Sequence, residues 1–102
     1  MFDIIASAAA KGDLEEIKTY LLTELCNPQA VANLEAAIRQ AYDTLVENPN
    51  AFPSCDNPRL RQKGYRKCVL SNYLFVYEVD ESANLVKIHR FFHGLQNWVL
   101  YL

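Results

Sequence analysis

The sequence predicts an α+β domain in which a helical hairpin covers one face of a small sheet. Two long segments of the N-terminal half repeat apolar residues at steps of three and four, as amphipathic helices do. The C-terminal half holds three short runs rich in aromatic and β-branched residues, which is typical of strands: 65–70, 73–80 and 85–92. A chain of 102 residues buries roughly two-thirds of its unfolded surface in one core, so residues 1–102 are expected to form a single domain.

The first expected elements are a short strand and a helix. Phe2 to Ala6 is apolar with two isoleucines at its centre, which predicts an N-terminal strand. Ser7 is a favourable N-cap, and the helix that it starts is expected to run to about Cys26. The apolar stripe of this helix consists of Leu14, Ile17, Leu21, Leu22 and Leu25.

A second helix is predicted directly after the first. Asn27 followed by Pro28 reads as an N-cap with proline in the first helical position, and Asn48-Pro49 stops the helix. The short link makes the two helices an antiparallel hairpin. Residues 48–58 contain three prolines and are expected to form a conformationally restricted loop.

The three remaining strands are expected to be antiparallel. The polar residues 81–84 have the length of a hairpin link between the last two strands. Alternation along the central strand puts Tyr73, Phe75, Tyr77 and Val79 on one face, where they are expected to pack under the helices. The tail, residues 95–102, is too apolar to be left in water, so we expect it to dock on its own sheet, with the surface of a partner as the alternative.

Composition favours a soluble cytoplasmic protein without cofactor or metal. No apolar run approaches the ~20 residues of a membrane span, and the N-terminus lacks the basic start of a signal peptide. The three cysteines have no metal-ligand spacing; Cys26 and Cys68 are expected to be buried and Cys55 exposed. The pI near 5.6 argues against general nucleic-acid affinity.

Charge is distributed unevenly along the chain. The first fifty residues carry three basic and eight acidic side chains, whereas the rest carry seven basic and four acidic ones. Five of those seven cations lie in nine residues that contain no acid: Arg59, Arg61, Lys63, Arg66 and Lys67. This basic run is suited to grip phosphates or an acidic peptide, since arginine forms bidentate charge-assisted bonds to either. The alternative is a solvated loop with an edge strand protected by charge.

Arg90 and His93 form a second polar motif, at the end of the last strand. Strict alternation would place Arg90 beside Val86 and Ile88 as well as Phe92, so its charge must reach solvent or a partner such as Glu78. His93 is suited to general acid–base chemistry at neutral pH. A purely structural pair, with His93 bonded to backbone in a turn, is an equal alternative.

The order of these motifs resembles the RelE/ParE superfamily of bacterial toxins. The resemblance rests on Gly64-Tyr65-Arg66, on 72–80 (NYLFVYEVD) and on 90–94 (RFFHG), within a matching order of strand, helical hairpin and three strands. It implies the toxin of a type II toxin–antitoxin pair, neutralised by an antitoxin protein that wraps it with an extended segment. We expect that segment to cover the sheet and the basic run.

The resemblance favours the ParE-like side of the superfamily, whose members poison DNA gyrase. In the other branch, the RelE-like ribosome-dependent messenger-RNA endonucleases, the central strand carries an arginine where this chain has Leu74. If the chain were such a nuclease, Arg66, Arg90 and His93 would be its candidate catalytic residues. The basic run, Arg59, Arg61, Lys63, Arg66 and Lys67, would bind target or antitoxin. A non-toxic antitoxin-binding module and a homodimer both stay open.

Overall fold

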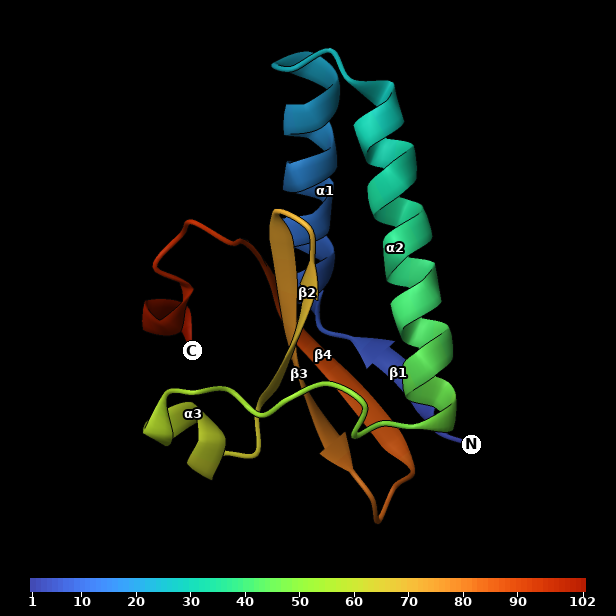
Figure 1. The fold of residues 1–102 in the computed structure, drawn as a ribbon, viewed down its shortest axis with the longest axis vertical. Coiled ribbons are helices and arrows are strands. Elements are labelled where there is room, and N and C mark those ends of the chain that lie inside the picture. The colour runs from blue at the N-terminus through green and yellow to red at the C-terminus, as the bar shows by residue number, and fades with distance from the viewer.

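The computed structural model describes residues 1–102 and has a four-stranded mixed sheet at its centre (Figure 1). The chain runs through β1 (Asp3–Ala6), α1 (Ala8–Thr23), α2 (Pro28–Glu47), α3 (Pro58–Gln62), β2 (Arg66–Leu70), β3 (Tyr73–Asp80), β4 (Leu85–His93) and a 3₁₀ turn, η1 (Trp98–Tyr101). The strand order is β1-β4-β3-β2; β1 is parallel to β4 and the other pairs are antiparallel. The predicted α+β class is confirmed, with the first strand inserted beside the last.

Side-chain caps set the helix starts as the sequence indicates. Ser7 Oγ accepts a bond from the Ala10 amide (2.9 Å), and Asn27 Oδ1 accepts one from the Ala30 amide (3.0 Å). The first helix ends at Thr23, earlier than predicted, and Cys26 has a left-handed backbone with φ 47°, which a helix cannot accommodate. None of the helices is both long and apolar enough to cross a lipid bilayer.

The helix α3 is an addition to the prediction. Asn57 caps it through bonds from the amides of Arg59 (3.0 Å) and Leu60 (3.3 Å), and Pro58 takes the first helical position. This repeats the Asn-Pro start of α2, although five residues are too few to display a helical period. The basic run therefore begins on a helix rather than in a loop.

The main core lies between the sheet and the helical hairpin. The predicted aromatic face is confirmed, because Phe75 and Tyr77 are fully buried there and Tyr73 and Val79 pack at the margin of the cluster. From α2 the core receives Leu34, Ile38, Ala41 and Leu45, the apolar stripe of that helix. Tyr77 also donates a hydrogen bond to the Pro49 carbonyl (3.0 Å), which ties the proline loop to the sheet.

A second, smaller core occupies the opposite face of the sheet. Its fully or nearly buried members are Cys55, Leu60, Leu74, Val76 and Phe92. The tail packs against them through Trp98, Val99 and Leu102, so the expected docking of the tail on its own sheet is confirmed. Figure 1 shows α3 and the C-terminal segment on the other side of the strands from α2. The sheet is thus covered on both faces.

A β-bulge in β4 corrects the predicted orientation of Arg90. Val76 is opposite Arg90, but the next residue, Tyr77, is opposite Ile88, so His89 is an extra residue in the strand. Strict alternation is broken at that point. As a result, Ile88 faces the helices, whereas Arg90 lies on the second face with Phe92.

The cysteines give a chemical test of these burial patterns. Contrary to expectation, Cys26 is exposed and Cys55 is buried, while Cys68 is buried as predicted. Burial raises the pKa of Cys55, and it raises the pKa of Cys68 to about 11, so the Cys68 thiol stays protonated at pH 8. We expect Ellman's reagent to modify one thiol rapidly in the native protein and all three in urea. Rapid native modification of two thiols would contradict the burial of either Cys55 or Cys68.

Candidate functional site

The basic run follows one continuous path from α3 into β2. Arg59 and Arg61 lie on α3, and Lys63 ends the helix. Gly64 then reverses the chain with φ 82°, a left-handed conformation that glycine adopts without strain. Arg66 and Lys67 are the first residues of β2. The five cations are therefore held on a short helix, a tight turn and a strand.

Two of these cations hold the tail. The Arg59 guanidinium donates to the main-chain oxygens of Leu102 (2.8 Å) and Val99 (3.1 Å). Lys63 Nζ donates to the same Leu102 oxygen at 3.2 Å. These bonds clamp the tail against α3.

The other three cations make separate contacts. Arg61 donates to the Cys55 carbonyl (3.2 Å) and lies 3.9 Å from the Asp56 carboxylate. Arg66 donates to the Phe52 carbonyl at 2.7 Å. Lys67 lies over the Trp98 ring, 5.7 Å from its centre. Arg59, Lys63 and Lys67 therefore lie around the tail, whereas Arg66 contacts a main-chain oxygen on the helix side of the sheet.

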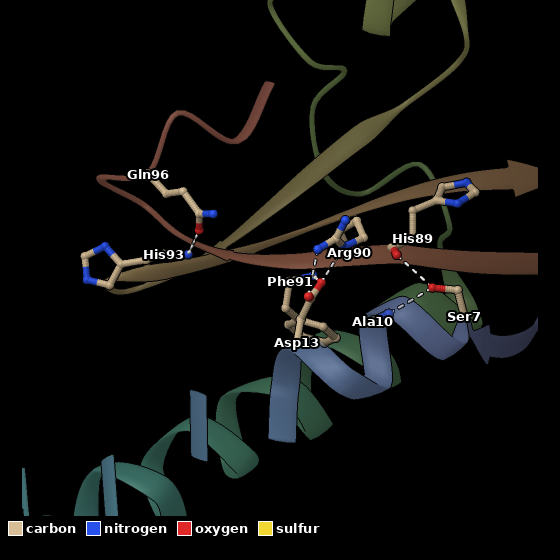
Figure 2. A network of polar contacts seen from close by, with 8 residues as sticks. All are labelled: Ser7, Ala10, Asp13, His89, Arg90, Phe91, His93 and Gln96. Carbon is tan, nitrogen blue, oxygen red and sulfur yellow. Dashed lines mark hydrogen bonds and ion pairs between the residues drawn. The ribbon is translucent and has the colours of Figure 1, made fainter. Parts of the chain in front are cut away.

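Arg90 is paired with Asp13 of α1, not with Glu78. The guanidinium donates two bonds to the Asp13 carboxylate, at 2.6 and 2.9 Å, and the Phe91 amide donates a third at 3.1 Å (Figure 2). Hydrogen bonding to Asp13 raises the pKa of Arg90 above its ordinary value. Glu78 instead contacts His89, with its carboxylate 3.0 Å from the imidazole Nε2.

Asp13 and Ser7 hydrogen-bond to main-chain groups on the outer edge of β4. The strand β1 covers only the first half of that edge, up to Ile88. Beyond it, the Ser7 hydroxyl donates to the His89 carbonyl at 2.7 Å, and Asp13 accepts from the Phe91 amide (Figure 2). An uncovered edge of this kind invites pairing with other chains. Through Asp13, Arg90 therefore belongs to the set of contacts that covers the outer edge of β4.

His93, the last residue of β4, lies apart from Arg90. Its Nδ1 accepts from the Leu95 amide (3.1 Å), and its ring meets Tyr73 edge to face at 5.3 Å between centres. Figure 2 shows its side chain pointing away from Arg90 and Asp13. This is the backbone-bonded turn histidine that the sequence offered as the structural alternative.

The three candidate catalytic residues do not converge. Arg66 pairs with Tyr77, and His93 pairs with Tyr73, which puts the two roughly 13 Å apart along the sheet. Arg90 lies opposite Val76, on the other face. Leu74, at the position where the nuclease branch has its arginine, is buried in the second core. No substrate phosphate could contact all three residues at once.

Sequence reasoning missed two apolar hollows beside the helices. One, of about 590 Å³, lies between the helical hairpin and the β2–β3 turn, with Tyr20, Leu25 and Tyr73 among its lining residues. The other, of about 430 Å³, follows α2 and β2 and includes Phe52 and Val69. The exposed apolar residues Leu25 and Val69 border them. The only sequence signal was an excess of apolar residues late in the first helix.

The second hollow adjoins an open strand edge. Residues 53–55 pair with the start of β2 through bonds to Tyr65 and Lys67, at 3.0 Å each. No segment covers the outer edge of β2 after Lys67, where Val69 is exposed. An apolar hollow next to a free edge is suited to receive an added strand or helix.

Comparison with known proteins gives one family match and several similar folds. A family model described as the ParE toxin of the type II toxin–antitoxin system parDE matches residues 4–98. No curated protein sequence matches the chain.

Among solved structures, the chromosomal ParDE toxin–antitoxin system of P. aeruginosa aligns with a TM-score of 0.68 at 20% identity, covering 91% of this chain and 96% of that one. The RelBE2 toxin–antitoxin complex of Mycobacterium tuberculosis gives 0.63 at 18% identity, covering 90% and 96%. The isolated E. coli RelE toxin gives 0.59 at 15% identity, covering 99% and 93%. At these identities the likeness concerns the fold.

Proposed function

We propose that this chain, a type II toxin–antitoxin toxin that belongs to the ParE toxin family, inhibits growth by binding a protein target such as DNA gyrase. The observation that carries the proposal is the dispersal of Arg66, Arg90 and His93. Catalysis of phosphodiester cleavage needs its groups held around one reacting phosphate. Arg90 is engaged by Asp13 and Arg66 by the Phe52 carbonyl, which leaves protein binding as the better-supported activity.

Controlled expression in bacteria tests the target. We expect filamentation and induction of the DNA-damage response, together with inhibition of supercoiling when purified toxin is added to gyrase. The Arg90→Lys and His93→Ala variants are expected to keep this activity if they fold. Rapid arrest of translation with cut messages, and normal supercoiling, would replace the proposal with the RelE-like alternative. Unchanged growth would leave only the antitoxin-binding module.

The antitoxin is the partner that the uncovered surfaces favour. The segment was expected to cover the sheet and the basic run, but α3 and the tail already pack on the second face of the sheet. The apolar hollow beside α2 and the open edge of β2 remain available. In the proposed complex an amphipathic antitoxin segment occupies that hollow, and the basic run guides its acidic part.

Charge reversal tests the guiding role of the basic run. Replacing Arg59, Arg61 and Lys63 with glutamate is expected to slow association with the antitoxin of the adjacent open reading frame by about tenfold or more at low salt. Stopped-flow association rates over a range of ionic strengths measure the effect, and the salt dependence should also flatten.

The matched control reverses Lys11, Lys18 and Arg39, three cations of the helical hairpin, and changes the net charge equally. Equal slowing by both triple variants would indicate a response to net charge alone. It would remove the basic run from the binding surface.

A further inference from the structure

The hairpin hollow is the cavity of about 590 Å³ between the helical hairpin and the β2–β3 turn. Figure 1 shows the upper turns of α1 and α2 extending past that turn, beyond the reach of the strands. Of the lining residues, Leu21 and Leu34 are buried, whereas Tyr20 and Leu25 are 51% and 53% exposed. The volume lies within the roughly 300–1,000 Å³ of small-ligand sites, and the antitoxin segment proposed above occupies the other hollow.

Two asparagines that line the hairpin hollow have already used their side-chain oxygens. Asn27 Oδ1 accepts from the Ala30 amide at 3.0 Å, and Asn33 Oδ1 accepts from the Gln29 side-chain amide at 2.9 Å. In each asparagine the polar atom that has no bond within the chain is Nδ2, which only donates. Both residues therefore present donors to the hollow.

His93 adds a donor from the end of the sheet. Its Nδ1 accepts from the Leu95 amide at 3.1 Å, and a neutral imidazole that accepts at Nδ1 carries its proton on Nε2. Tyr73, which meets the His93 ring edge to face, also lines the hollow. Burial raises the pKa of Tyr73, and Tyr20 adds to the effect, so the Tyr73 hydroxyl stays protonated at neutral pH. The donor set of the hollow is thus Asn27, Asn33, Tyr73 and His93.

The remaining chemistry of the hairpin hollow is apolar and uncharged. Nine of its fourteen lining residues are hydrophobic, and none is Asp, Glu, Lys or Arg. A ligand suited to it joins an apolar body to a head group that accepts hydrogen bonds. An ionised carboxylate is such a head group, because it has two accepting oxygens and no proton to donate. Bonds from neutral donors to a carboxylate are charge-assisted and roughly twice as strong as bonds between neutral groups.

We infer that the hairpin hollow binds a small amphipathic acid. The apolar body of the ligand packs against Leu21 and Leu34, and its carboxylate is bonded by members of the donor set. This site goes beyond the proposed function, because neither the toxic activity nor the antitoxin segment requires it.

Calorimetric titration of the full chain with decanoate and with decylammonium tests the head group. The two probes have the same apolar tail, but the carboxylate only accepts hydrogen bonds and the ammonium only donates them. Decanoate is expected to bind one to one and at least about tenfold more tightly. The net charge of −2 favours the cation, so preference for the anion reports recognition by the donor set. Equal affinities, or tighter binding of decylammonium, would overturn the inference.

Two tryptophan substitutions on α2 locate the bound probe. Ala30 lines only the hairpin hollow, and Thr44 lines only the hollow beside β2. Ala30→Trp fills the proposed site and should abolish decanoate binding, whereas the matched control Thr44→Trp should retain it. Circular dichroism checks that both variants are folded. Decanoate binding retained by folded Ala30→Trp would place the probe elsewhere and refute the site.

Removal of donors gives a test that does not depend on filling the hollow. The double variant Asn33→Leu with His93→Phe keeps apolar volume but lacks two members of the donor set. Its affinity for decanoate is expected to fall about tenfold, while its affinity for decylammonium stays the same. An unchanged preference for decanoate would contradict the assigned head-group contacts.

A second copy of the chain is the alternative occupant of the hairpin hollow. Sedimentation velocity of the parent chain and of Ala30→Trp measures self-association directly. We expect the same sedimentation coefficient for both. A dimer that is lost in Ala30→Trp, together with no decanoate binding by the parent chain, would assign the hollow to the second copy and overturn the inference.

Discussion

Replacing Phe75 by alanine is expected to lower the free energy of unfolding by about 3–5 kcal/mol. Phe75 is 0% exposed at the centre of the main core, with ring centres of Tyr42, Tyr77 and Phe91 at 5.7, 5.9 and 5.5 Å. Removing the ring leaves a cavity. Its three aromatic neighbours lie on α2, β3 and β4 and cannot all move in to fill it. For a domain of this size, such a loss lowers the thermal midpoint by roughly 15 °C or more.

Two controls accompany this variant in urea unfolding followed by circular dichroism. Phe75→Leu keeps most of the apolar volume and should have a distinctly smaller effect. Val69→Ala, at an exposed position on the neighbouring strand, should change the free energy of unfolding by no more than about 0.5 kcal/mol. Similar losses for Phe75→Ala and Val69→Ala would mean that the aromatic face does not form the core.

Replacing Asp13 by alanine is expected to destabilise the protein by about 2–4 kcal/mol, somewhat less than the loss of one partner of a fully buried pair. The Asp13 and Arg90 side chains are 16% and 29% exposed, so both are largely removed from water. The substitution leaves the Arg90 guanidinium and the Phe91 amide without their acceptor. Chemical unfolding measures the change, and a double-mutant cycle with Arg90→Met isolates the coupling between the two side chains.

The pair Lys18–Glu35, whose glutamate side chain is 47% exposed, supplies the comparison for the Asp13 prediction. Glu35→Ala removes an ion pair of 3.2 Å between the two helices and should cost no more than about 1 kcal/mol. The Asp13 effect should also persist in high salt, where surface pairs weaken. A loss equal to that of Glu35→Ala would show that the bonds of Asp13 do not secure the edge of β4.

The sign of the Arg90 pKa shift sets how this pair responds to pH. A folded-state pKa above the unfolded one contributes stability that is fully present below the unfolded value and is lost as pH rises through the folded value. Both values lie far above neutral pH. From the arginine side, the cost of Asp13→Ala should therefore be the same at pH 6 and at pH 9.

Sequence patterns predicted the elements whose formation depends on residues close together in the chain. The Asn27-Pro28 start fixes α2, and period-two alternation fixes the buried face of β3. The bulge at His89 has no such signal, because it follows from the register that β3 and β1 impose together. Arg90 finds a partner 77 positions away, so its contact with Asp13 could not be predicted from residues near it.

The sequence identified candidate residues for the site, but it could not predict how they are arranged in space. The cations of the basic run were expected to lie together beside the sheet; in the structure Arg66 contacts Phe52 on the helix side, whereas Lys67 contacts Trp98 on the opposite face. Their engagement by the tail depends on the direction in which the chain leaves Gly94, which short-range pattern does not specify. Arg66 and His93 were grouped because both belong to the motifs that resemble the toxin superfamily. In the sheet they lie at different positions along the strands, opposite Tyr77 and Tyr73.

The parallel pairing of β1 with β4 sets the time at which the toxin can be assembled during its synthesis. Ser7 and His89 contact each other although 82 positions separate them, and β4, the last strand to be made, lies in the interior of the sheet. Contacts of such long range form slowly, since a large loop must close first. A nascent chain that has not reached Leu85 can form its helical hairpin, but it has no strand to join β1 to β3. A product that ends before Leu85 therefore lacks β4 at the centre of the sheet and cannot form the four-stranded sheet described here.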